Sequence, residues 1–167
     1  MPRRNITIHQ KVDGRKEEEM REALYRGRRV DNKQWVYGFY FNVAFVDGSK
    51  RHFILPLEAD ASRNKTLGEV QVEVDGETVG QFTGLKDKNG VEIYENDIVK
   101  WGHIKGGEEN PVRIAIVKFN PDLQFECTNI KDKWFGDGRN QVFHYGNLIY
   151  TETTKWLEVI GNIHEVK

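Results

Sequence analysis

Turn signals that recur about every eight to twelve residues, with short apolar runs between them, constrain the fold of this chain most. From Trp35 to Phe41, aromatic residues occupy every second position, which is the period of a strand and not of a helix. Asp47-Gly48 and Asn89-Gly90 suit the tight turns that join antiparallel strands. This spacing is typical of a β-barrel or a β-sandwich.

The sequence therefore predicts a mainly β fold with little helix. We expect a small barrel formed largely by residues 77–165, with N-terminal strands over residues 24–55 packed beside it. The segments expected to be extended are 24–29, 35–46, 53–55, 70–74, 78–82, 91–94, 98–101, 112–119, 123–127, 142–145, 148–150 and 156–160. Gly84 and Gly90 are expected to serve turns, at least one of them with a positive φ.

The core of this fold should contain apolar residues from the alternating runs. We expect these side chains to be largely buried: Trp35, Phe39, Val79, Leu85, Ile93, Ile98, Val99, Ile116 and Ile160.

The length of 167 residues suits one domain. Residues 1–19 are interpreted as an N-terminal arm, in which Asn5–His9 could add a strand. Residues 20–167 are expected to form the domain itself, with a seam near Asp75 between N-terminal strands, 20–76, and the barrel region that begins at residue 77. Because short strands leave unpaired edges, we also expect a homo-oligomer, in which the arm could contact a neighbouring protomer.

Composition excludes several classes of protein. The net charge of −1 excludes a globally basic nucleic-acid binder, and the single cysteine excludes a disulfide framework or a multi-cysteine zinc site. No apolar run approaches the roughly 18 residues that a bilayer-crossing helix needs. We therefore expect a soluble, cytoplasmic protein that does not bind membranes.

Three segments of the sequence resemble a known family. They are M-R-E at Met20 with R-G-R-R-V-D-N-K-Q-W-V-Y-G at 26–38, E-T-V-G-Q-F-T-G-L-K-D-K-N-G-V-E-I-Y-E-N-D-I-V-K-W at 77–101, and E-V-I-G-N-I-H-E at 158–165. Together they are similar to the YopX family of phage and prophage proteins. The resemblance spans residues 20–165, so residues 1–19 look like an extension relative to the family.

The resemblance implies a phage or prophage origin and a bacterial host. It also implies a mainly β fold that includes a small barrel of the Src-homology-3-like type. The family has no established activity and no agreed catalytic residues, so none can be transferred to this sequence.

No arrangement of residues points to a reaction. His103 lies near Asp97 and Glu95, but a solvated turn explains these side chains better than a metal site does. Cys127 sits in an apolar run, where a buried small hydrophobe is the simpler interpretation. We assign no catalytic residue, no cofactor and no metal ligand, and the sequence favours a non-enzymatic protein. An enzyme whose site is assembled from distant residues stays an alternative.

Nucleic-acid binding has a candidate region. Residues 1–33 hold ten Lys or Arg against six Asp or Glu, a balance of +4. Within this region Arg26, Arg28 and Arg29 form a basic cluster next to Tyr25. Aromatic side chains beside cations are typical of barrels that hold single strands. The alternative interpretation is that the arginines lie on solvated strand edges, where charge deters edge-to-edge pairing.

Protein binding is the favoured function. Trp101, Trp134 and Phe135 border polar loops and form the candidate contact patch for a protein partner. The same residues could instead pack over the end of the barrel. We predict a binding module with an unidentified protein partner from the host or the phage, and single-stranded nucleic acid as the alternative ligand.

Overall fold

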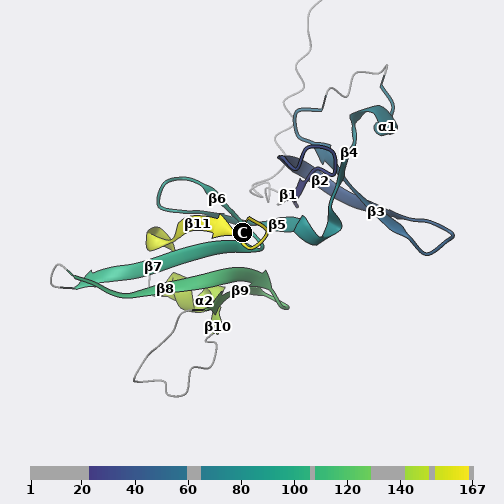
Figure 1. Ribbon diagram of the computed structural model, residues 1–167. Helices are drawn as coiled ribbons and strands as arrows, with labels where there is room; N and C mark the ends of the chain where they lie inside the picture. The colour runs from purple at the N-terminus through teal and green to yellow at the C-terminus, as the bar shows by residue number, and fades with distance from the viewer. Residues whose placement is uncertain (1–22, 60–64, 106–107, 129–141, 151–152, 166–167) are drawn as a thin grey trace, which may run out of the picture.

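The computed structural model describes residues 23–59, 65–105, 108–128, 142–150 and 153–165. Within these residues the chain forms two antiparallel sheets and little helix, so the predicted mainly β fold is confirmed. Figure 1 shows one sheet built from the N-terminal part of the chain and the other from the C-terminal part. The strand β5 (Gly80–Lys86) joins them.

The first sheet contains most of the N-terminal strands. Its order is β4 (Val72–Val74), β3 (Lys50–Pro56), β2 (Trp35–Ala44), β1 (Tyr25–Arg28), β5 and β6 (Glu92–Tyr94). β2 and β3 form a hairpin whose turn projects away from the rest of the chain (Figure 1). The short helix α1 (Leu67–Val70) and the 3-10 turn η1 (Gly76–Thr78) flank β4.

The second sheet contains the C-terminal strands. Its order is β10 (Val142–His144), β9 (Leu123–Cys127), β8 (Glu108–Phe119), β7 (Asp97–Lys105) and β11 (Glu158–Asn162). The helix α2 (Tyr145–Tyr150) and the 3-10 turn η2 (Thr153–Trp156) connect β10 to β11. The predicted strand over residues 148–150 is therefore wrong, because one helical turn carries Leu148 into the core.

No closed barrel is found among the described residues, which corrects the expected architecture over residues 77–165, and the Src-homology-3-like type is not confirmed. The physical reason is the pairing of β5, which bonds to β1 as well as to β6 and so joins the first sheet. The β5–β6 turn still reaches the second sheet, where the Lys88 N–H donates to the Leu157 carbonyl over 2.9 Å.

The main core lies between the β5–β6 hairpin and the second sheet. Its fully buried members include Ile93, Val99, Val117, Phe125 and Leu157. The burial predicted for Ile93 and Val99 is thus confirmed.

Two residues of the expected core are instead exposed. Phe39 is 41% exposed and Ile160 is 45% exposed, so their predicted burial is wrong. Alternation assigns a residue to a face of the sheet, but it does not say whether another layer covers that face. The remaining expected core residues are half-buried: Trp35, Val79, Leu85, Ile98 and Ile116.

Gly90 lies in the turn between β5 and β6, as predicted. Gly84 lies within strand β5, where the register with β6 shifts, so its predicted place in a turn is wrong. Gly84 and Gly90 have φ values of 80° and 83°, which glycine adopts without the steric cost that a side chain carries.

Candidate functional site

Exposed apolar side chains concentrate on the β2–β3 hairpin. Six of the twelve large apolar side chains exposed among the described residues lie there, and each of the six is at least 39% exposed. We call this group the hairpin surface: Tyr37, Phe39, Val43, Phe45, Val46 and Leu57. Because water penalises exposed apolar area, such a concentration marks a candidate interaction surface.

Strand geometry places the central members of the hairpin surface on one face. Tyr37, Phe39 and Val43 are separated by even numbers of residues along β2, so their side chains project from the same side of the sheet. Between them, Phe41 stacks on Phe53 of β3, with ring centroids 5.5 Å apart. The face therefore combines exposed apolar side chains with a packed aromatic pair.

A charged pair lies along the same hairpin. The Arg51 guanidinium sits 5.4 Å from the Phe53 ring centroid and forms an ion pair with Glu73 of β4. The Arg51 Nε donates to Glu73 over 2.8 Å. Aromatic and aliphatic side chains next to an arginine are a typical composition for a protein interface.

A buried ion pair fixes the base of the hairpin. The Arg26 guanidinium lies between the rings of Trp35 and Tyr94, 4.7 Å from each centroid, and it donates to the Asp97 carboxylate. Arg26 is 9% exposed and Asp97 is 1% exposed. The pair thus joins β1 to the start of β7 inside the protein.

The Asp97 carboxylate is held by three donors. Besides Arg26, it accepts the Tyr94 backbone N–H over 2.8 Å and the Asn162 amide over 3.3 Å. Burial raises the pKa of Asp97 above its ordinary value, and Arg26 with the two hydrogen bonds opposes that rise. Burial and a hydrogen bond to Glu92 also raise the pKa of Tyr94, so its phenol stays neutral.

The residues that follow β11 contact the same junction. Trp35 Nε1 donates to the Glu165 carboxylate over 2.6 Å, and the Arg28 guanidinium donates to the His164 carbonyl over 3.1 Å. The three segments that carry the family resemblance, 26–38, 77–101 and 158–165, therefore meet here. The junction determines how β2 leaves the body of the protein.

The three arginines of the predicted basic cluster all bond to other groups of the protein. Arg26 is buried against Asp97, and Arg28 also donates to the Lys33 carbonyl over 3.0 Å. Arg29 forms a two-point ion pair with Asp31 at 2.9 and 2.7 Å. The three arginines therefore do not form an open row of cations.

Tyr25, the aromatic member predicted beside the cluster, is half-buried. Its ring contacts Tyr40 at 5.3 Å between centroids.

The predicted partner patch is only partly described. Trp101 is 7% exposed and packs edge-on against Phe125 and Phe143 in the core of the second sheet. It therefore presents little surface to a partner. Trp134 and Phe135 lie outside the described residues.

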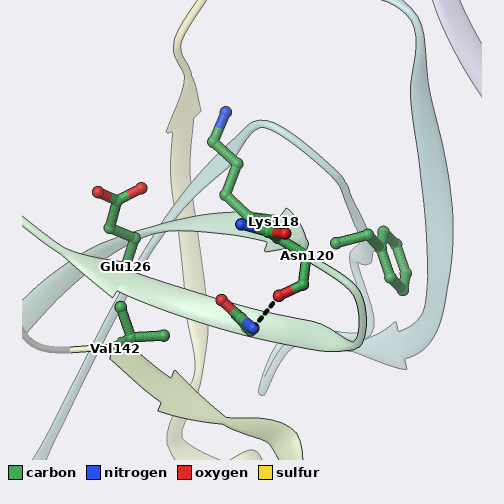
Figure 2. Close-up of a pocket in the computed structure, with 6 residues that line it drawn as sticks. Lys118, Asn120, Glu126 and Val142 are labelled. Atoms are coloured by element: carbon green, nitrogen blue, oxygen red, sulfur yellow. Dashed lines mark hydrogen bonds between the residues drawn. The ribbon is translucent and has the colours of Figure 1, made fainter.

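A pocket of about 310 Å³ lies at the β8–β9 turn (Figure 2). Its lining residues are Lys118, Phe119, Asn120, Gln124, Glu126 and Val142. The Gln124 amide donates to the Asn120 carbonyl, and Lys118 donates to Asn96 Oδ1 over 2.9 Å. Lys118 and Glu126 are the two ionisable side chains that line this pocket.

Two further observations bear on chemistry within the described part of the chain. No group of three or more His, Cys, Asp or Glu side chains is placed to hold a metal ion there. Cys127 is 1% exposed, and burial raises the pKa of its thiol to about 11.

Among the helices described, none has the length and apolar character needed to cross a membrane.

Comparison with known families identifies the family of this chain. The family model described as YopX protein matches residues 24–166, which is nearly the whole chain, and the chain therefore belongs to the YopX family. No curated protein matched the sequence.

The hairpin surface was not predicted from the sequence, although one signal for it was present. Phe45 and Val46 directly precede the Asp47-Gly48 turn, and side chains at the tip of a hairpin have few neighbours to pack against. The Arg26–Asp97 pair gave no comparable signal, because its partners are 71 residues apart.

Proposed function

We propose that this YopX-family protein is a non-enzymatic protein-binding module, and that the hairpin surface is its contact with the partner. The observation that carries the proposal is the concentration of six exposed apolar side chains on one projecting hairpin. The remaining six exposed apolar side chains of the described chain are distributed over β11, three turns or loops, α1 and β10.

The energy available to such a contact is substantial. Burying apolar area contributes about 25 cal/mol per Å², so covering a large side chain that is already half-buried contributes roughly 1 kcal/mol. The sum over six such side chains would support a specific contact after the entropic cost of association is subtracted. Tyr37 and Phe39 would contribute most, since aromatic anchors dominate binding energies.

Order at the base of the hairpin supports the proposal further. Arg26 packs between Trp35 and Tyr94, and Trp35 bonds to Glu165, so β2 is attached to two other segments. A surface that is held in place before binding loses less conformational entropy on association. We infer that the partner is a protein of the host or of the phage, met in the bacterial cytoplasm.

The test compares two double variants, each of which removes two exposed apolar side chains. Phe39→Ser with Val43→Ser alters the hairpin surface, while Val91→Ser with Ile160→Ser alters exposed side chains elsewhere. Captured proteins are identified from lysate of the bacterium that carries the gene, and each candidate is then titrated in purified form. We expect the hairpin variant to weaken binding about tenfold or more and the control to bind like the parent. Equal binding by both variants would refute the proposed surface.

Single-stranded nucleic acid is the second candidate ligand, because Tyr37 and Phe39 are exposed aromatic side chains on a sheet face. Anisotropy titrations with single-stranded DNA and RNA at several salt concentrations test it, using Arg28→Ala with Arg29→Ala beside the parent. Affinity that falls steeply with salt, and less steeply in the variant, would favour nucleic acid over protein.

A further inference from the structure

An apolar strip runs along the hairpin formed by β2 and β3. The two strands pair in one continuous register, and residues that lie opposite each other in it project from the same face of the sheet. Leu57 follows β3 and donates its backbone N–H to the Tyr37 carbonyl over 3.2 Å, so it continues the row of β3. The strip consists of Tyr37, Phe39, Phe41 and Val43 on β2, with Phe53, Leu55 and Leu57 facing them from the other row. Four of these side chains are exposed: Tyr37, Phe39, Val43 and Leu57.

The strip has the dimensions of one α-helix. Alternate residues of a strand are about 6.8 Å apart, so the row from Tyr37 to Val43 spans about 20 Å. Neighbouring strands lie about 4.8 Å apart, so two rows of side chains make a band about 10 Å wide. A helix with its side chains is about 10 Å across, and about 14 residues cover 20 Å of its axis. One helix laid along the hairpin would therefore cover both rows.

The chemistry of the strip favours a segment that satisfies its own backbone. The Tyr37 hydroxyl is the polar side-chain group that the strip contains, and its other members are hydrocarbon. A partner segment laid on this face loses water from its backbone N–H and C=O groups and gains almost no acceptor or donor in return, which is costly. A helix bonds these groups internally, whereas an extended peptide leaves them without partners.

Addition of a strand is the other common way in which a sheet takes up a peptide, but the strip does not offer it. β2 lies between β1 and β3 in the sheet, and β3 lies between β2 and β4. The contact made by the strip therefore goes through the side chains of a sheet face and not through the backbone groups of an edge.

We propose that the apolar strip binds one amphipathic helix of the partner, laid along the β2–β3 hairpin. The inference rests on the function proposed above and adds the structural class of the segment that is recognised. The helix presents apolar residues at positions i, i+3, i+4, i+7 and i+11 to the strip, and polar residues to water.

The charge of the strip suits this ligand better than it suits a nucleic acid. No residue from Trp35 to Val46 is charged. Arg51 lies opposite Val43 at the end of the strip, and its guanidinium is paired with Glu73. Phosphates depend on cations that can neutralise them, whereas the apolar stripe of a helix matches an uncharged face.

Peptide selection on the full-length protein tests the class of segment. A library of random peptides of about 16 residues, long enough to cover the strip as a helix, is selected for binding. Each binder is then titrated against the parent, against Phe39→Ser with Val43→Ser, and against the control Val91→Ser with Ile160→Ser. We expect dissociation constants of about 1 to 100 μM, apolar residues at helical spacing, and a loss of at least tenfold with the strip variant alone. Matching melting temperatures show that both variants fold.

Proline substitution in the binders distinguishes a helix from an extended peptide. Proline at a central position that faces water should weaken binding about hundredfold, because it breaks a helix, and alanine at the same position should leave binding unchanged. Far-UV circular dichroism should show that the peptide gains helix on binding.

The outcomes separate the two proposals. If the binders that depend on the strip tolerate proline, or if their apolar residues alternate with period two, the helix inference is overturned and the contact surface stands. If no binder depends on the strip, the contact surface itself is refuted. Sedimentation adds one more outcome, because a parent that self-associates beside a monomeric strip variant would make a second copy the occupant and overturn the inference.

Discussion

Arg26 of β1 and Asp97 of β7 are 71 residues apart in the chain and form a buried ion pair at the junction of the two sheets. The guanidinium also lies 4.7 Å from the ring centroids of both Trp35 and Tyr94. Desolvation makes such a pair costly to form and more costly to break, because a single remaining charge would be buried without a partner.

Removing Arg26 should therefore destabilise the protein strongly. We expect Arg26→Ala to lower the free energy of unfolding by about 3–5 kcal/mol, since Asp97 is left buried. Arg51→Ala removes the exposed pair with Glu73 and should cost far less, because solvent screens that pair. Urea unfolding of both variants measures the difference, and equal losses would contradict the structural role assigned to Arg26.

The carboxylate of Asp87 should account for part of the stability that the protein loses at acid pH. Burial acts to raise the pKa of Asp87, but hydrogen bonds from the Val91, Val159 and Asn89 backbones and from the Asn89 side chain lower it below the ordinary value of 3.8. The unfolded chain thus binds the proton more readily than the folded protein does. The stability that this carboxylate contributes is fully present above pH 3.8 and is lost as the pH falls through the folded pKa.

The variant Asp87→Asn tests this linkage. We expect a loss of about 2 kcal/mol at pH 7 and a smaller difference from the parent as the pH falls below 3.8, because the parent loses its charged acceptor there. Glu58→Gln, which removes an exposed carboxylate, serves as the control for net charge. A constant difference between Asp87→Asn and the parent at every pH would contradict the assignment.

The sequence predicts much of the local structure because strand period and turn chemistry are properties of neighbouring residues. The alternation from Trp35 to Phe41 correctly indicated β2, and Asn89-Gly90 correctly indicated the β5–β6 turn. α2 escaped prediction because six residues are too few to show a helical period.

Pairing between distant segments could not be predicted in the same way. β5 bonds to β1 across more than fifty residues, and nothing in either segment specifies this choice over barrel closure. The exposure of Phe39 could not be predicted for the same reason. Buried strands show the same alternation of apolar residues, and only the tertiary arrangement leaves the face that carries Phe39 uncovered.

Glycine positions should differ sharply in their tolerance of alanine. At Gly38 a Cβ would lie 1.9 Å from the Leu55 carbonyl oxygen, whereas at Gly90 it would meet nothing within 4 Å. We expect Gly90→Ala to cost about 1 kcal/mol for its φ of 83°, and Gly38→Ala to cost about 3 kcal/mol, because backbone must move. Gly146→Ala in α2 has open space and should cost nothing. Thermal and urea unfolding of the three variants measure these losses of stability. A loss for Gly38→Ala that is the smallest of the three would contradict the expected order.

Cys127 should act as an internal reporter of unfolding. Burial raises the pKa of its thiol to about 11 from a reference value of 9.0, which lowers the thiolate fraction near pH 8 about hundredfold, and a 1% exposed side chain is also closed to reagents. We expect no measurable reaction of the native protein with a disulfide reagent over minutes, and complete reaction in urea. Ser49→Cys, at the exposed hairpin turn, should add one thiol that reacts within seconds while Cys127 stays protected. If native Cys127 reacted as fast as the thiol introduced at position 49, the core formed by β8, β9 and α2 would have to open far more readily than its packing indicates.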